Sequence, residues 1–251
     1  MTITYVNDLR LSEMATGDNS GTWGTVTNTN LELIGEAFGF GTEAITTDAD
    51  AHPSTIADGS TDPARAMYVK YTGALNSNCT VTIGPNTVNK FYFIENATTD
   101  SGASGPYSLI ISQGSGASIT VPNGQTKAVY LNGAGSGAAV VDAFASLSVV
   151  DLKVQDDLTF SSDSAVISFG ADADTTLTHT DGSGLTLNST NKLMFNDASQ
   201  FIQGSSATVL SIAATDEIDL TATAIDLNGT LDVSGTALVT GVLTTTAATV
   251  F

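Results

Sequence analysis

The sequence predicts a mainly β protein in three parts. These are an N-terminal segment with one short helix (residues 1–41), an antiparallel β-sandwich-like domain (42–145) and a repetitive β shaft (146–251). Three observations support the prediction. One apolar stretch has helical spacing, many stretches after residue 65 alternate with a period of two, and every tryptophan, tyrosine, proline and cysteine precedes residue 131. The chain therefore becomes compositionally simpler toward its C-terminal part.

The helix is predicted to begin near residue 29. Thr29-Asn-Leu-Glu32 fits a capping box, in which the Thr hydroxyl and the Glu carboxylate each bond a backbone amide of the first turn. Apolar residues then recur at helical spacing, and Gly39 and Gly41 offer stops. A helix of about ten residues with one apolar face follows from this pattern.

The apolar side chains of this segment are candidate contact residues. Trp23 is the only tryptophan, and its indole can bury a large area against a neighbouring domain or subunit. Leu31, Ile34 and Phe38 form the apolar face of the predicted helix. These four residues are predicted to anchor the chain or to lie between subunits.

The middle domain is predicted from alternating apolar residues separated by turn-forming residues such as Gly84-Pro85-Asn86 and Pro122-Asn-Gly124. The short links are of hairpin size, which favours an antiparallel sandwich with a core of its own. The predicted strands are centred on Met67-Val69-Tyr71, Val81-Ile83, Phe91-Phe93, Leu109-Ile111, Ile119-Val121 and Val129-Leu131.

The C-terminal part repeats a unit in which two apolar residues flank any residue, at a spacing near eight. Each doublet places two side chains on one face of a short strand. Two aliphatic residues per unit contribute about 3–5 kcal/mol on burial, whereas ordering the unit costs on the order of 1 kcal/mol or more per residue. The doublets run from Leu152/Val154, Leu158/Phe160, Ile167/Phe169 and Leu177/His179 through Phe201/Gln203 and Leu210/Ile212 to Leu231/Val233.

Such a unit cannot enclose a core alone, because a single-chain solenoid usually needs about 20 or more residues per turn. Three chains that share each layer would supply enough residues, which predicts a trimeric β-prism or triple β-helix. A single-chain β-helix with three doublets per turn fits the same pattern and remains the alternative. The residues predicted to face the trimer axis are Leu185, Leu187, Leu193, Phe195, Ile218, Leu220, Ile225 and Leu227.

Composition excludes several classes of partner. The 251 residues include 7 basic and 26 acidic ones, for a net charge of −19, so we expect neither nucleic acid nor an anionic membrane as a partner. Cys79 is the single cysteine and is predicted to be a buried strand residue. The N-terminus has no Sec-type signal pattern, and no apolar run approaches the roughly 20 residues of a membrane span. We therefore expect synthesis in a cytoplasm and no membrane insertion.

The sequence contains no recognisable set of catalytic residues. We therefore predict that the protein is not an enzyme and needs no cofactor. Gly133-Ala-Gly-Ser-Gly137 lacks the Lys-Ser/Thr of a phosphate loop and is interpreted as a linker. Asp48-Ala-Asp-Ala-His52 and Asp172-Ala-Asp174 do not fit an EF-hand and are interpreted as solvated turns. His179 occupies a doublet position, so three copies near a trimer axis could hold Zn²⁺, Fe²⁺ or Ni²⁺; the alternative is a ring of neutral histidines.

Several phrases resemble tail-fibre and other appendage proteins of marine bacteriophages. They are Asn7-Asp-Leu-Arg-Leu-Ser-Glu13, Gly17-Asp-Asn-Ser-Gly-Thr-Trp-Gly24, Thr27-Asn-Thr-Asn-Leu-Glu32, Asp156-Asp-Leu-Thr-Phe160 and Asp226-Leu-Asn-Gly-Thr-Leu-Asp-Val233. The resemblance implies a virion-attached homotrimer that contacts other virion proteins of tail, collar or head, and a host surface receptor. A bacterial surface adhesin or filament subunit is the alternative, and a glycan-cleaving tailspike is a third class.

The acidic charge is also distributed in a way that suits a fibre. Residues 151–251 carry 13 acidic and 2 basic residues, which gives −11, whereas residues 1–150 carry 13 and 5, which gives −8. Because the shaft charges fall at predicted turns, they face water and oppose sideways association of neighbouring rods.

Overall fold

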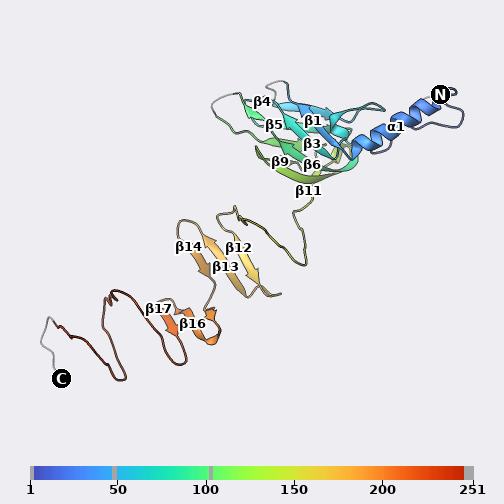
Figure 1. The fold of residues 1–251 in the computed structure, drawn as a ribbon. Helices are drawn as coiled ribbons and strands as arrows, with labels where there is room; N and C mark the ends of the chain where they lie inside the picture. The colour runs from blue at the N-terminus through green and yellow to red at the C-terminus, as the bar shows by residue number, and fades with distance from the viewer. Residues whose placement is uncertain (1–2, 47–49, 102–103, 246–251) are drawn as a thin grey trace. The chain divides into compact units, whose positions relative to one another are not determined.

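The computed structural model describes residues 3–46, 50–101 and 104–245, and the chain divides into two compact units, residues 1–152 and 153–251 (Figure 1). The described chain is mainly β, with one α-helix and several sheets, none of them closed. The mainly β fold class and the single N-terminal helix are therefore confirmed. The N-terminal segment and the predicted sandwich belong to the same unit.

Helix α1 spans Trp23–Ala37 and is longer than predicted. Thr22 is its N-cap, but the Thr22 hydroxyl donates to the carbonyl of Asn19 and caps no helix amide. The capping box at Thr29 is wrong, because Thr29 and Glu32 lie inside the helix, where the amide of Thr29 belongs to the helical ladder. The helix begins just after the turn at Asn19, well before the predicted capping box.

The first sheet has five strands in the order β1-β3-β6-β10-β11. Strands β1, β3 and β6 pair in parallel, and β10 pairs antiparallel with both β6 and β11. The strand bounds are Phe40–Ala44 for β1, Tyr68–Thr72 for β3, Asn89–Asn96 for β6, Thr126–Asn132 for β10 and Val140–Asp142 for β11.

The second sheet has four strands in the order β2-β5-β8-β9, of which the first three pair in parallel. A two-stranded parallel sheet, β4 with β7, lies at the turns that connect the two larger sheets. The bounds are Ala51–Thr55 for β2, Ala74–Leu75 for β4, Cys79–Gly84 for β5, Thr99–Asp100 for β7, Leu109–Ser112 for β8 and Ile119–Val121 for β9; the 3₁₀ turns are η1, Pro63–Arg65, and η2, Gly135–Gly137.

The predicted strands exist, and β6 with β10 and β8 with β9 are antiparallel as predicted, but the predicted antiparallel arrangement is wrong for β3 with β6 and for β5 with β8, which pair in parallel. From β1 to β8 the chain alternates between the two large sheets, so that equivalent positions of successive turns pair in parallel: Phe40 with Tyr68, and Tyr68 with Phe93. We call this segment the parallel coil. A short link that crosses to the opposite sheet has the same length as a hairpin turn, and for that reason link length alone does not reveal the arrangement.

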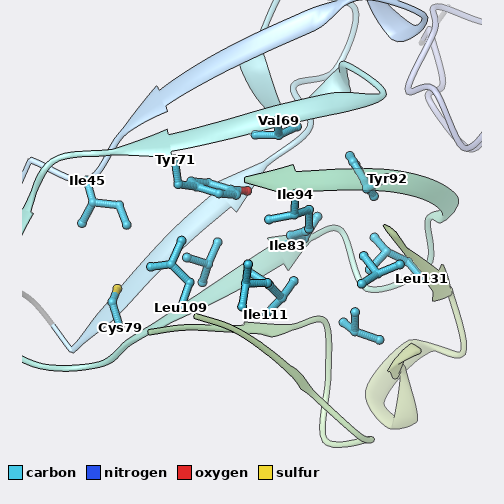
Figure 2. Packing of buried hydrophobic residues seen from close by; sticks show 14 of the residues in the cluster. Ile45, Val69, Tyr71, Cys79, Ile83, Tyr92, Ile94, Leu109, Ile111 and Leu131 are labelled. Carbon is cyan, nitrogen blue, oxygen red and sulfur yellow. The ribbon is translucent and has the colours of Figure 1, made fainter. Parts of the chain in front are cut away.

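The core of the first unit lies between the two large sheets (Figure 2). Alternate residues of each strand point inward, including Val69 and Tyr71 on β3, Ile94 on β6 and Ile111 on β8. Cys79 on β5 belongs to the same cluster, which confirms its interpretation as a buried strand residue. Burial also raises the pKa of the Cys79 thiol.

The glycine-rich stretch at residues 133–137 is not a linker between units. It joins β10 to β11 and is held by backbone hydrogen bonds, in which the amide of Ser115 donates to Ser136 and the amide of Gly135 donates to Asn86. Gly133 and Gly135 have positive φ, a conformation that glycine adopts at little cost. The glycines therefore serve a tight turn inside the first unit.

The second unit contains two separate three-stranded antiparallel sheets, in the orders β12-β13-β14 and β15-β16-β17. No strand is assigned in residues 153–165 or 214–245. The bounds are Val166–Phe169 for β12, Thr175–Thr180 for β13, Gly184–Leu187 for β14, Leu193–Phe195 for β15, Asp197–Ser206 for β16 and Val209–Ala213 for β17.

Candidate functional site

The sheet β12-β13-β14 gathers three predicted doublets on one face. Ile167 pairs with Leu177 and Leu177 pairs with Leu187, while His179 pairs with Leu185 in the neighbouring row. Since paired residues of an antiparallel sheet point to the same side, these side chains form a continuous apolar face.

This face is hollowed, and much of it is exposed in the described part of the second unit. A groove of about 330 Å³ is lined by Phe160, Ala165, Ile167, Leu177, His179 and Leu185. Leu185 is 70% exposed. An apolar face of this kind is normally buried against another layer of secondary structure.

The sheet β15-β16-β17 repeats the arrangement with one difference. Leu193, Ile202 and Ile212 pair across the three strands, so they share one face. Phe201 pairs instead with Met194 and Ala213 on the opposite face. The predicted Phe201/Gln203 doublet is therefore wrong in its facing, because Ile202 fills the apolar row.

A second groove of about 430 Å³ borders this sheet and includes Phe195, Ile202, Ile212 and Ile218 among its lining residues. The predicted axis residues thus fall into two groups. Leu185, Leu187, Leu193 and Phe195 lie on strands, whereas the four C-terminal ones lie in residues 214–245, where no strand is assigned. Leu187 is half-buried, and the other seven are exposed: Leu185, Leu193, Phe195, Ile218, Leu220, Ile225 and Leu227.

Helix α1 carries a second apolar surface, which we call the helix stripe: Trp23, Leu31, Ile34 and Phe38. Trp23 is 63% and Phe38 73% exposed, and Ile34 is half-buried. The neighbouring face of the helix is occupied, because Leu33 and Ala37 are buried and the side chain of Asn30 bonds the backbone of Ser12. The four predicted contact residues therefore lie beside the face of α1 that Leu33 and Ala37 pack against the first unit.

A polar cluster missed by the sequence analysis joins the two large sheets of the first unit. Nε2 of His52 lies 2.8 Å from Oε1 of Glu43, and the hydroxyl of Ser54 donates to Oε2 of Glu43 over 2.6 Å. Tyr71 in turn donates to Ser54 over 3.0 Å, and burial, followed by the charge of Glu43, raises the pKa of Tyr71. Ser54 is fully buried, so this Ser–His–Glu set cannot present a nucleophile to a substrate.

The candidate metal-binding residues of the sequence were Asp48, Asp50, His52, Asp172, Asp174 and His179. Within residues 3–46, 50–101 and 104–245, no group of three His, Cys, Asp or Glu side chains could hold a metal ion. Asp48 lies outside the described residues. His179 lines an apolar groove of a single chain, so an axial ion there would need three copies, and it stays a prediction.

The chain matches no protein-family model, no curated protein and no solved structure. In the described part of the chain, no helix has the length and hydrophobicity that crossing a membrane requires.

Proposed function

We propose that the protein is a non-enzymatic structural subunit of a virion appendage, a homotrimeric phage tail fibre or a related fibre. In this proposal, three copies of the C-terminal region wrap into one shaft. The shaft connects the virion to a host surface, and other virion proteins hold the assembly at one end. Phrases that resemble those of marine phage appendages suggested this class, and the apolar faces of the second unit support a shared shaft.

The observation that carries the proposal is the exposed apolar row that crosses each three-stranded sheet in the second unit. The row Ile167, Leu177, Leu187 and the row Leu193, Ile202, Ile212 each cross a whole sheet. A meander with one apolar side needs a second layer against that side. Three such sheets placed around an axis cover each other's apolar faces and form a β-prism.

A trimer also accounts for the segments without strands. In residues 214–245 the doublets keep their spacing, but their backbone finds no ladder within one chain. Ile218, Leu220, Ile225 and Leu227 are exposed there. Strand partners from two other copies would satisfy the backbone groups and bury the aliphatic side chains at the same time.

The homotrimer is tested by native mass spectrometry of the full chain. A mass three times 25.6 kDa that survives mild detergent is expected. A mass near 25.6 kDa at micromolar concentration would rule out the shared shaft. Immunogold electron microscopy of virions from an infected culture tests whether the protein belongs to a virion appendage. Label on an appendage is expected. Label found only on cells would favour an adhesin.

A further inference from the structure

The sequence contains three asparagine–glycine pairs: Asn123-Gly124, Asn132-Gly133 and Asn228-Gly229. The first two lie in the first unit and the third lies in the second unit. A glycine that follows an asparagine has no Cβ to obstruct the approach of its backbone nitrogen to the asparagine side chain, and its backbone is conformationally free. Whether such a pair reacts depends on how the folded chain holds the atoms involved.

The reaction open to such a pair is deamidation through a cyclic imide. The backbone nitrogen of the glycine attacks Cγ of the asparagine, so that a new C–N bond closes the ring. The Cγ–Nδ2 bond breaks, and Nδ2 leaves as ammonia with the proton of the glycine amide. Water then opens the imide at either carbonyl and gives aspartate or isoaspartate. One water is consumed, one ammonia is released, and nothing is oxidised or reduced.

The pair Asn123-Gly124 is held at both reacting positions. Nδ2 of Asn123, the leaving group, donates to the carbonyl of Thr98 over 2.7 Å. The amide of Gly124, the attacking group, donates to the carbonyl of Asn96 over 2.8 Å. Both hydrogen bonds must break before the two groups can meet.

The pair Asn132-Gly133 is also held at both positions. Oδ1 of Asn132 accepts from the amide of Ala134 over 3.2 Å and from the amide of Ala139 over 2.9 Å. The amide of Gly133 donates to Oε1 of Gln113 over 3.2 Å, and Gln113 is buried. The side chain of Asn132 is exposed, so hydrogen bonds rather than burial restrain this pair.

The pair Asn228-Gly229 has no such restraint. In the part of the chain that the structure describes, neither the side chain of Asn228 nor the amide of Gly229 has a hydrogen-bond partner. Both residues are exposed and lie in the stretch after β17, which carries no strand in Figure 1. A Cβ on Gly229 would meet nothing within 4 Å, so no neighbouring group blocks the approach.

We propose that Asn228 is a site of spontaneous deamidation and that Asn123 and Asn132 are protected by the fold. Each hydrogen bond that must break first slows the reaction by about two- to tenfold. Two or more such bonds at each pair of the first unit give Asn228 an advantage of about tenfold or more. The inference goes beyond the function proposed above and does not depend on a homotrimer.

The product changes both the charge and the backbone of the second unit. Each converted chain gains one negative charge in a region, residues 151–251, that already carries −11. Asn228 lies between the doublets Ile225/Leu227 and Leu231/Val233. Isoaspartate adds one methylene to the backbone between them, which alters the facing of the second doublet relative to the first. In the proposed shaft, this change would occur in three chains at the same level.

Peptide mass spectrometry of the full chain tests the site. The folded protein is incubated for several weeks at mildly alkaline pH, where more of the glycine amide is deprotonated, and conversion of each pair is followed. Asn228 should convert about tenfold faster or more than Asn123 and Asn132. Asn228→Gln is the matched control, because its longer side chain would have to close a larger ring. It should remain unconverted and leave the other two pairs unchanged.

The same incubation in guanidinium chloride separates the effect of the fold from that of the neighbouring sequence. All three pairs should then convert at similar rates. Similar rates in the folded protein would overturn the proposal, and so would a preference for Asn228 that persists in the unfolded chain, because the hydrogen bonds would then not be its cause.

Native mass measured on the folded samples distinguishes this inference from the proposed function. A trimer in which Asn228 is as stable as Asn123 overturns the deamidation site and leaves the shared shaft standing. A monomeric mass with rapid conversion at Asn228 overturns the shaft and leaves the deamidation site standing.

Discussion

The carboxylate of Glu43 on β1 and the imidazole of His52 on β2 meet 2.8 Å apart and tie the first strand of the five-stranded sheet to the first strand of the four-stranded sheet. Ser54 shares the same carboxylate through its second oxygen, Oε2. The contact holds the first turn of the parallel coil, which has a neighbouring turn on one side only.

The first prediction concerns this contact. Glu43→Ala should lower the free energy of unfolding by about 1–3 kcal/mol, since it leaves the buried hydroxyl of Ser54 without its acceptor. Urea denaturation followed by circular dichroism measures the change. Glu32→Ala, which removes an exposed carboxylate on α1, should change stability by less than about 0.5 kcal/mol. Equal losses in the two variants would show that the Glu43 contacts contribute nothing.

The second prediction tests the facing of the shaft sheets. Leu177→Asp places a charge on the apolar face of β13 and should convert the proposed trimer to lower-mass species, because three carboxylates would be buried near one axis. Thr178→Asp changes the neighbouring residue, whose side chain points to the other face, and should retain the trimer. Native mass spectrometry of both variants decides. If only Thr178→Asp dissociated the trimer, the interface would lie on the face of Thr178, and the proposed role of the Leu177 face would be wrong.

The third prediction concerns His179. Its neighbour across the sheet is Leu185, and the other residues that line the groove are all apolar, so a leucine at this position extends the apolar face. His179→Leu should therefore raise the melting temperature of the trimer, and elemental analysis of the wild type should find no stoichiometric transition metal. One zinc, iron or nickel ion per three chains, lost together with stability in His179→Leu, would instead establish the axial metal site.

The fourth prediction uses Lys90, whose Nζ donates to the carbonyl of Ala66 over 2.9 Å and lies 3.8 Å from the ring centroid of Tyr92. Burial, opposed by the charge of Asp62, lowers the pKa of Lys90 from 10.5 to about 7. Below pH 7 both folded and unfolded states hold the proton, and the folded state bears the full desolvation cost. Between pH 7 and 10.5 the unfolded state binds more protons, so wild-type stability rises by up to about 1.4 kcal/mol per pH unit.

Lys90→Met removes this titration while keeping a long apolar side chain. Its stability relative to the wild type should be highest near pH 6 and should fall steadily toward pH 10. Because the pKa values of Tyr71 and Tyr92 are also raised, the comparison is made as a difference between the two proteins at each pH. A difference that stays constant from pH 6 to 10 would mean that Lys90 titrates normally in the folded state.

Local patterns predicted the strands well but not their partners. The centres of β3, β5, β6, β8, β9 and β10 all follow from period-two alternation, because each strand buries every second residue whichever strand it pairs with. Pairing depends on whether a short link turns back or crosses to the opposite sheet. Whether a link turns back or crosses depends on how the strands pack into the shared core, in which Tyr71, Ile83 and Ile94 come together. The residue pattern of a single strand carries no information on this packing.

Among the exposed apolar residues, too, local features could be predicted from the sequence and long-range neighbours could not. Leu31, Ile34 and Phe38 could be identified because helical spacing is a local property, and Trp23 because it is the only tryptophan. The stack of Phe40, Tyr68 and Phe93 on the outer face of the five-stranded sheet could not, since these residues become neighbours only through the parallel register. Phe40 also precedes the first strand that alternation indicated. In the second unit, the doublets identified the apolar faces except at Phe201/Gln203, where Ile202 lies in the apolar row instead.

The parallel coil has a consequence for how such a protein can change length. Because each turn pairs only with the turn before and the turn after it, duplication of one turn adds a strand to each large sheet without rearranging the others. A duplicated turn would also copy one aromatic position between Tyr68 and Phe93. The stack of aromatic rings on the outer face of the five-stranded sheet would then gain one ring, so a single duplication would lengthen both the coil and this stack.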